Sequence, residues 1–525
     1  MSVKAYPRLA EAKELFRQGF NDEASMRVIE HLRENRTDAR GFALLGEIAL
    51  ESGALVQSEK FLRQAIAHGD RSFEVVRNLA KVVLQQDRLD EALEAFTALD
   101  EQFQQINLTS TRAMILDRLG RTAEALELHK RVVNDPAAEA RDWILYGHSL
   151  RFAGRLDEGI AAYRHVLESD PQRGEAWWSL ADIKAKVLTD EDMEVMEKAL
   201  GEAVDILNVT PLHMALGRGW HDRGDYARAF SHYQMGNRLR SQAFPYDPDQ
   251  LSSEIDQFIE MSDLLSPPPP PPASASDDPV PIFLISLPRS GSTLLEQMLS
   301  QHPQIEAVGE LPYIQSLLRS AFELHLRREP ISVPALVQRL SAIEKKALAN
   351  EYLHRASLHR KTNVRYFIDK LPLNWTNIVL IREALPQARF IEIRRNPMDC
   401  CFSNFSHNFG TAHAASFDLV HQARACVDYT RLMDHLQSVA PGLTCGVRYE
   451  DLVEDPEREL RKILSYLDLA WDESLLRFYE AGRSVRTPSA EQVRRPVNRS
   501  GIGNWKPYAK WLGPLREALG PLADA

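Results

Sequence analysis

Small residues recur through the first half of the chain at intervals of 33 or 34 residues, and larger side chains follow them at a fixed distance. The first set is Gly46, Ala80, Ala113, Gly147 and Ala181. Twelve residues after each of its first four members stands a second small residue, namely Ser58, Ala92, Ala125 or Gly159. Four residues further on stands a larger one, namely Leu62, Phe96, His129 or Tyr163. A last copy fits Gly217, Ala229 and Tyr233. Small residues let two antiparallel helices touch and the larger residue fills the gap, so the pattern predicts stacked helix pairs.

This period and pattern resemble the tetratricopeptide repeat over roughly residues 10–240. The resemblance implies an α-helical superhelix with a concave groove, in a domain at residues 1–245. The groove is expected to hold a protein or peptide acceptor. Alternatively, the repeat domain is a scaffold that positions or dimerises the next domain. Both functions, and a homo-oligomer, stay open at this point.

Residues 246–279 are predicted to form a helical and proline-rich linker. The stretch "SPPPPPPASASDD" (Ser266–Asp278) contains six consecutive prolines followed by small polar residues. Consecutive prolines favour an extended polyproline II conformation, and small polar residues are flexible. We interpret the stretch as a spacer, with a ligand for a proline-binding domain as the alternative.

Apolar runs alternate with amphipathic helical patterns in the rest of the chain, residues 280–525. The apolar runs are Pro281–Ile285, Tyr366–Ile368, Ala388–Ile393 and Thr444–Arg448. Alternating strands and helices predict an α/β domain with a central parallel sheet and helices on both faces. Ligands of such domains bind at the carboxyl ends of the strands.

The loop after the first of these strands is suited to bind an anion. In "LISLPRSGSTLLEQML" a helix is predicted to begin near Ser292, and its N-terminal N–H groups and dipole favour negative charge. Gly291 permits close approach of the anion, and Arg289, Ser290, Ser292 and Thr293 add charge and donors. Gly291 occupies the place of the lysine in a GxxxxGK[ST] loop, which argues against ATP as the ligand.

The same loop resembles the one with which sulfotransferases hold the 5′-phosphosulfate of 3′-phosphoadenylyl sulfate, and it is most similar to the protein-tyrosine sulfotransferase type. "FIEIRRNPMDCCFSNF" resembles the family's 3′-phosphate site, with Arg395 and Ser403 eight residues apart. "VRYEDLVEDP" resembles the strand end beside adenine, at Tyr449. "NRSGIGNWK" resembles the RKGxxGDWK motif, with substitutions at several positions. In this last motif the resemblance implies donor contacts from Arg499, Ser500 and Lys506.

The resemblance implies a sulfuryl transfer in which positioning and charge stabilisation do most of the catalysis. Glu310 is the expected base for the acceptor hydroxyl, and burial is expected to raise its pKa. Lys370 is expected to stabilise the leaving phosphate oxygen, and Arg289 to contact the sulfuryl group. His407 and His413 stay as alternative bases, because cytosolic members of the family use a histidine.

The composition limits the classes of partner and the cellular location that we expect. A net charge of −11 and a pI of about 5.9 disfavour nonspecific nucleic-acid binding. The N-terminus lacks the apolar core of a secretory signal, no stretch of 18 apolar residues predicts a membrane span, and the four cysteines form no CxxC pair. We expect a cytoplasmic protein that needs no metal.

The acceptor stays the least determined part of the interpretation. Similarity to the tyrosine-sulfating type implies a tyrosyl hydroxyl in a protein, whereas those enzymes act in secretory compartments. A saccharide, a lipid or a small phenol is the alternative acceptor. Two other functions also stay open: a kinase or other nucleotide-dependent transferase with the same loop, and a non-catalytic repeat scaffold.

Overall fold

A computed structural model describes residues 7–524 except residues 184, 204, 263–278, 326–330, 411 and 481–494. Its contacts divide the chain into two compact units. The first runs to Asp142 and includes Pro312–Ile331, and the second comprises Trp143–Leu311 and Ser332–Ala525. The repeat helices beyond Asp142 therefore share a unit with the sheet. This division differs from the boundary at residue 245, which stays a prediction of the sequence pattern.

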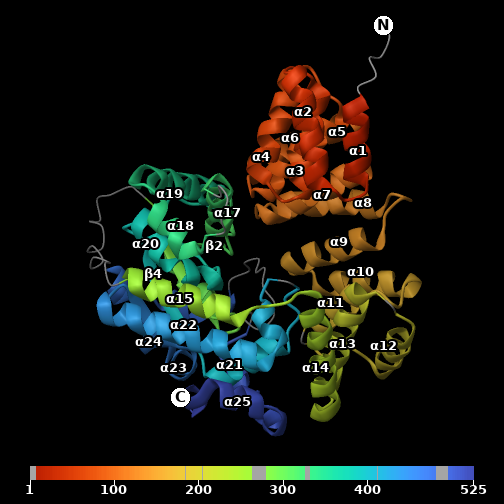
Figure 1. Cartoon of the computed structure of the whole chain (residues 1–525). Coiled ribbons are helices and arrows are strands. Elements are labelled where there is room, and N and C mark those ends of the chain that lie inside the picture. Colours follow the sequence, from red (N-terminus) through yellow and green to blue (C-terminus); the bar gives the residue numbers. More distant parts are fainter. Residues whose placement is uncertain are drawn as a thin grey trace. The chain divides into compact units, whose positions relative to one another are not determined.

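The first unit contains antiparallel helix pairs (Figure 1). The paired helices are α1 (Pro7–Arg17), α2 (Asn21–Glu34), α3 (Ala39–Glu51), α4 (Leu55–Ala67), α5 (Phe73–Gln85), α6 (Leu89–Phe103), α7 (Ile106–Arg118) and α8 (Thr122–Val133). The unit also includes α17 (Tyr313–His325). Within the pair α3–α4, a Cβ on Gly46 would lie 2.6 Å from Leu62 Cγ, and Ser58 Oγ donates to Gly46 O at 2.6 Å. The small residues therefore allow the contact between helices that the sequence predicted.

The second unit begins with further pairs of the same kind. Its repeat helices are α9 (Ala140–Phe152), α10 (Leu156–Ser169), α11 (Gly174–Ala181), α12 (Asp190–Glu202), α13 (Ile206–Asp222) and α14 (Tyr226–Ala243). A Cβ on Gly147 would lie 2.4 Å from Tyr163, and one on Gly217 would lie 2.6 Å from Tyr233. The helical-repeat prediction is confirmed. Helix α15 (Pro248–Ser262) follows, and the polyproline stretch lies outside the described residues.

A parallel sheet forms the core of the rest of the second unit. Within the described residues it has the strand order β2-β3-β1-β4-β5. The strands are β1 (Val280–Ile285), β2 (Ile305–Gly309), β3 (Tyr366–Asp369), β4 (Arg389–Arg394) and β5 (Thr444–Arg448), and every neighbouring pair is parallel. The four predicted strands and the parallel sheet are confirmed. The sequence analysis missed β2, in which only Ile305 and Ala307 of the five residues are buried.

Helices cover both faces of this sheet. The helices of this part of the chain are α16 (Ser292–Leu299), α18 (Val333–Arg339), α19 (Ala342–Ser357), α20 (Ile378–Ala384), α21 (Pro397–Phe405), α22 (Leu419–Val439), α23 (Tyr449–Glu454), α24 (Pro456–Leu467) and α25 (Gly513–Leu519). Ile282 and Leu284 of β1 pack in one cluster with residues of α16 and α24. Phe283 points to the other face, where its ring lies 5.5 Å from that of Tyr352 in α19. Alternate residues of β1 are thus buried on both faces, which explains its uninterrupted apolar sequence.

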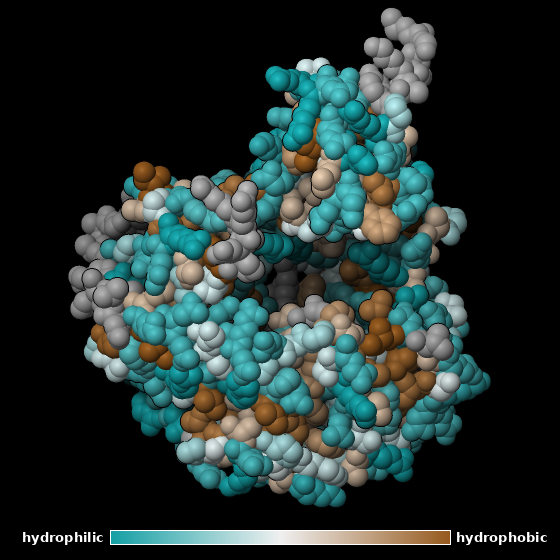
Figure 2. Space-filling view, in the orientation of Figure 1, coloured by the Kyte–Doolittle hydropathy of each residue, from teal (hydrophilic) through white to brown (hydrophobic). Residues whose placement is uncertain are grey.

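Hydrophilic residues predominate on the face of the molecule seen in Figure 2, and hydrophobic ones form smaller groups there. Among the helices of the described residues, none has both the length and the apolar composition that crossing a bilayer requires. All four cysteines are buried free thiols, and burial raises the pKa of Cys400 to about 12.

Candidate active site

Each strand of the sheet is followed closely by one of the predicted site residues. Glu310 comes directly after β2, Lys370 after β3, Arg395 after β4 and Tyr449 after β5, while Arg289 lies four residues beyond β1. Parallel strands bring their carboxyl ends to one edge of the sheet. All five residues line one cavity of about 460 Å³ at that edge.

The cavity has a strongly positive lining. Among the described residues, its cationic side chains are Arg218, Arg289, Lys370, Arg395 and Arg495, and Glu310 is its acidic one. The chain as a whole carries a net charge of −11, so the positive charge is concentrated locally. Such a concentration attracts a ligand with several negative charges.

The loop between β1 and α16 has the backbone conformation of a close-fitting anion loop. Arg289 and Gly291 both have positive φ angles, of 67° and 98°, and α16 begins at Ser292. A Cβ on Gly291 would lie 2.3 Å from Tyr449 Cδ2, so only glycine fits there. Ser292 and Thr293 line the cavity with Gly291. Ser290 does not, because its buried hydroxyl lies 3.4 Å from Cys400 Sγ.

Glu310 and Lys370 form an ion pair at the ends of neighbouring strands, in which Lys370 Nζ donates to Glu310 Oε1. The Lys370 side chain is 1% exposed, whereas that of Glu310 is 44% exposed. The expected burial of Glu310 is therefore not found, and Glu310 follows β2, which is an edge strand of the sheet. The lysine, by contrast, follows the inner strand β3, whose residues are all buried.

Asp369 fixes the segment that carries Glu310. Its Oδ1 accepts hydrogen bonds from Leu311 N at 3.4 Å and Leu371 N at 3.2 Å, and its Oδ2 accepts one from Tyr352 Oη at 2.9 Å. Burial raises the pKa of Asp369 to about 7. The structure shows that it ties the end of β3 to the residue after Glu310.

Arg395 lies beneath the β1 loop. Its Nη1 donates to Arg289 O at 2.7 Å, its Nη2 donates to Gly501 O, and its guanidinium carbon lies 5.3 Å from the centre of the Tyr449 ring. Its Nε is buried and has no hydrogen-bond partner among the described residues. Arg289 Nε donates to Ser403 Oγ at 3.4 Å, which places Ser403 beside the loop. Burial and the charges of Arg395 and Arg218 lower the pKa of Arg289.

The C-terminal motif reaches the cavity only in part. Ser500 lines it, whereas the exposed Arg499 lies 3.5 Å from Glu454 and the exposed Lys506 folds against Gly503. Neither basic side chain is brought to the cavity. Asp399 holds the motif in place, because its carboxylate accepts hydrogen bonds from the backbone N–H groups of residues 503 and 505 at 2.7 and 3.2 Å.

The two alternative histidine bases lie elsewhere. His413 is buried, its Nε2 lies 2.9 Å from Gln422 Oε1, and burial lowers its pKa to about 4. His407 lines a smaller cavity of about 100 Å³, where its Nδ1 lies 3.8 Å from Asp182 Oδ1. Neither histidine lines the larger cavity with Lys370. Of the three residues considered as the base, only Glu310 therefore shares a cavity with Lys370.

Several lining residues were missed by the sequence analysis. Arg218 and His221 come from repeat helix α13, and Ile183 from the turn after α11. Gly501 also lines the cavity and packs against Tyr449, since a Cβ there would lie 2.4 Å from Tyr449 Oη. The glycine in the C-terminal motif was a usable signal, but nothing in the periodic pattern distinguishes Arg218 from other polar residues of the repeats.

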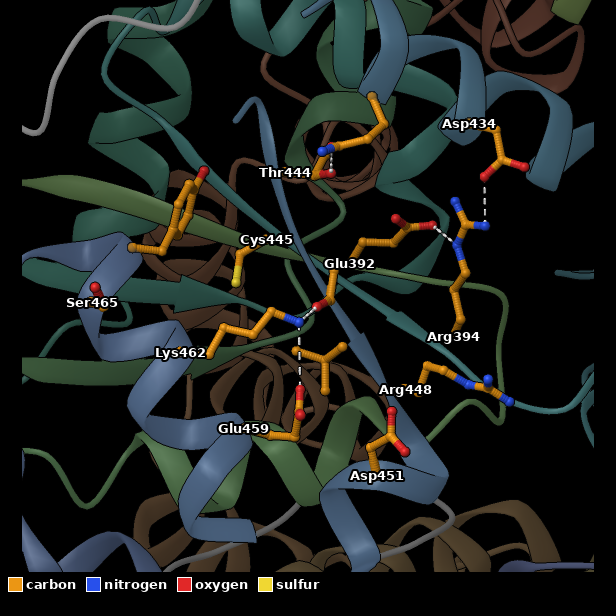
Figure 3. A pocket seen from close by; sticks show the side chains of 14 residues that line it. Glu392, Arg394, Asp434, Thr444, Cys445, Arg448, Asp451, Glu459, Lys462 and Ser465 are labelled. Atoms are coloured by element: carbon orange, nitrogen blue, oxygen red, sulfur yellow. Dashed lines mark hydrogen bonds and ion pairs between the residues drawn. The ribbon is translucent and has the colours of Figure 1, made fainter. Parts of the chain in front are cut away.

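A second cavity of about 730 Å³ lies beside β4 and β5 (Figure 3). Five of its charged side chains contact one another: Arg394 contacts Glu392 at 2.5 Å and Asp434 at 2.7 Å, and Lys462 lies 3.5 Å from Glu459. It contains none of the predicted site residues. Across the described residues, no group of three or more His, Cys, Asp or Glu side chains is placed to hold a metal ion.

Comparison with known proteins agrees with this geometry. Residues 281–473 match the profile of the Sulfotransferase family, and residues 146–186 match that of the Tetratricopeptide repeat. The C-terminal region carries a sulfotransferase-family domain. The matched residues include the loop between β1 and α16, Glu310, Lys370, Arg395 and Tyr449, whereas the C-terminal motif lies beyond them.

Individual relatives are distant. An uncharacterized protein of Aquifex aeolicus (strain VF5) is 28% identical over 527 residues, which cover 98% of this chain and 67% of that protein. Protein-tyrosine sulfotransferase A of Caenorhabditis elegans is 24% identical over 246 residues, covering 45% of this chain and 62% of that protein. The sulfotransferase domain from the curacin biosynthetic pathway shares 20% identity, covering 44% of this chain and 92% of that structure, with a TM-score of 0.31.

Proposed function

We propose that the chain transfers a sulfuryl group from 3′-phosphoadenylyl sulfate to an acceptor hydroxyl. The observation that carries this proposal is the arrangement of Glu310, Lys370, Arg289, Arg395 and Tyr449 around one positive cavity at the carboxyl edge of the sheet. The donor carries a phosphosulfate at one end and a 3′-phosphate at the other. The β1 loop is suited to the first group, and Arg395 with Ser403 to the second.

In this mechanism Lys370 and Glu310 are paired before the donor binds. The phosphosulfate competes for the ammonium of Lys370, and Glu310 is released toward the acceptor. The acceptor oxygen attacks sulfur in line with the phosphate oxygen, and Glu310 takes the hydroxyl proton. The bond between sulfur and the bridging oxygen breaks as the new sulfur–oxygen bond forms. Lys370 stabilises the charge that develops on the leaving phosphate, and Arg289 and the loop N–H groups bind the sulfuryl oxygens.

The proposed acceptor is a tyrosine in a protein. Two observations support it: a relative that matches this region is named protein-tyrosine sulfotransferase, and Glu310 is 44% exposed, which leaves it accessible to a large acceptor. The repeat helices are the proposed contact for that protein, because tetratricopeptide repeats form extended concave surfaces.

The test uses the full chain with labelled 3′-phosphoadenylyl sulfate and a cell lysate separated into protein, glycan and lipid fractions. We expect label in the protein fraction, retention of the label on tyrosine after hydrolysis under conditions that preserve the ester, and no loss of transfer when a chelator removes Mg²⁺. Label in glycan or lipid alone would contradict the tyrosine acceptor and leave the donor assignment intact. Phosphoryl transfer from ATP instead would contradict the donor assignment.

A further inference from the structure

Helix α13 of the repeat region contributes side chains to the cavity of the sulfotransferase-family domain. Arg218 and His221 lie one turn apart near the end of this helix, and both line the cavity that contains Arg289 and Lys370. Arg218 also lines the smaller cavity, together with Arg289 and Ser403. The two cavities therefore share the region between the β1 loop and helix α21, and Arg218 borders that region from the repeat side.

The position of α13 relative to this region is held by several contacts within the second unit. His221 Nδ1 lies 2.8 Å from Tyr508 Oη, and the two rings are stacked at 5.9 Å with planes 3° apart. In the paired helix α14, Asn237 Nδ2 donates to Phe405 O at 2.7 Å. Phe405 is the last residue of α21, the helix that carries Ser403. These contacts join α13 and α14 to the elements that carry Tyr508 and Ser403, and Arg218 and Ser403 line the same two cavities.

Arg218 has hydrogen-bonding capacity left for a ligand. Its described ion pair is with Asp222, one turn further along the helix, where Nη2 and Oδ1 lie 2.9 Å apart. Its Nε is buried and has no hydrogen-bond partner among the described residues. A buried donor without a partner costs free energy unless a ligand or water satisfies it.

The charge of Arg218 acts on its neighbours in the cavity. The pKa of His221 is lowered to about 4, first by burial and next by the charge of Arg218. His221 is therefore neutral at physiological pH. Arg218 also contributes to the lowered pKa of Arg289, after burial and the charge of Arg395. Arg218 is therefore the cation that α13 brings to a site where three guanidinium groups repel one another, and a bound anion relieves that repulsion.

We propose that Arg218 is a donor-binding residue whose guanidinium pairs with the phosphate group that Ser403 contacts, the 3′-phosphate of the sulfuryl donor. This inference rests on the proposed function. It gives the repeat region a direct part in the donor site, in addition to any acceptor that its groove holds. The donor would then be bound from two sides, by Arg395 on the sheet edge and by Arg218 on the repeat helix.

The test measures calorimetric binding of adenosine 3′,5′-bisphosphate and adenosine 5′-phosphate to the full chain and to four variants. Arg218→Ala is expected to weaken bisphosphate binding about tenfold or more, since a charge-assisted hydrogen bond is lost. Arg218→Lys is expected to weaken it less. Both variants are expected to change binding of the 5′-phosphate by less than about threefold, because that ligand lacks the group that Arg218 contacts.

Two matched variants separate this role from a structural one. Asp222→Asn removes the ion pair of Arg218 but keeps its guanidinium, and Arg238→Ala removes an exposed charge from the neighbouring helix α14. Both are expected to bind the bisphosphate as the wild type does. Unchanged binding in Arg218→Ala, equal weakening of both ligands, or weakening in Asp222→Asn would overturn the role of Arg218 alone. A wild-type chain that binds no bisphosphate would overturn this inference and the proposed donor together.

Discussion

Lys370 and Glu310 form an ion pair across the ends of two neighbouring strands, and the lysine is buried while the glutamate is accessible. Lys370 N also donates to Gly309 O at 2.9 Å, so the pairing of β2 and β3 continues up to the pair itself. The sheet register therefore determines the distance between the proposed base and the group proposed to stabilise the leaving oxygen. Each member of the pair can be tested separately, because each is proposed to act on a different atom of the reaction.

Replacing Lys370 by methionine is expected to lower kcat by about a hundredfold or more, which is the size of effect seen when one stabilising donor is removed from an active site. Methionine keeps the length of the buried side chain and removes the charge. The measurement is steady-state transfer of labelled sulfate, with the melting temperature recorded for each variant. Lys462→Met is the control, because Lys462 lines the second cavity (Figure 3) and its side chain is 52% exposed. A Lys370→Met enzyme with wild-type kcat would contradict the role.

Replacing Glu310 by glutamine is expected to lower kcat by about a hundredfold or more while leaving bisphosphate binding within about twofold, since glutamine cannot take the acceptor proton. The two readings are single-turnover transfer and calorimetric binding of adenosine 3′,5′-bisphosphate. The second reading shows that the donor site is intact. Full activity in Glu310→Gln would show that another group is the base. His407→Gln then tests the histidine that lines a cavity with Arg289.

Much of the fold could be predicted because its signals are local. β1 is an uninterrupted apolar run that is buried on both faces. The repeat helix pairs can be identified from small residues such as Gly147, which packs against Tyr163. β2 could not be predicted in this way, since "IEAVG" is short and only partly buried at the sheet edge. The C-terminal motif "NRSGIGNWK" was a less reliable guide to the donor site, because the structure places Ser500 in the cavity lining but not Lys506.

The contribution of Arg218 could not be predicted for a different reason. It lies 71 residues before Arg289 in the chain and is brought near it by the packing of α14 on α21, which no local pattern encodes. The role of Asp369 likewise depends on Leu311 and Tyr352, which approach it only in the folded sheet. Residues that follow a strand were found from the sequence, and residues delivered by packing between helices were not.

Two glycines that contact Tyr449 are expected to respond differently to a change in that tyrosine. Gly501→Ala puts a Cβ 2.4 Å from Tyr449 Oη, so Tyr449→Phe is expected to restore most of the stability and donor binding that Gly501→Ala loses. Gly291→Ala is not expected to be rescued, because its Cβ meets the ring at 2.3 Å and its φ of 98° strains any larger residue.

A double-mutant cycle measures this difference, with the melting temperature and bisphosphate binding of each single and double variant as readings. A favourable coupling energy between residues 501 and 449, with none between 291 and 449, is the expected result. Equal rescue of both glycine variants would show that the loop conformation at Gly291 is not required for binding.

The buried carboxyl of Asp369 is expected to make the stability of the chain depend on pH. Burial raises its pKa to about 7 from an ordinary value of 3.8, so the folded chain keeps a proton that the unfolded chain loses between those pH values. The free energy of unfolding therefore falls as pH rises from about 4 to about 7, by up to about 1.4 kcal/mol per pH unit, and the contribution is constant above and below that window.

The control variant is Asp369→Asn, which keeps an oxygen that accepts from Leu311 N and Leu371 N but cannot ionise. Denaturant unfolding across this range is expected to show the wild type losing stability relative to Asp369→Asn with rising pH. Tyr352→Phe removes a hydrogen bond that lowers the pKa of Asp369, and so is expected to extend the falling region to higher pH. Parallel pH profiles for the wild type and Asp369→Asn would show that the carboxyl ionises as readily in the fold as in water.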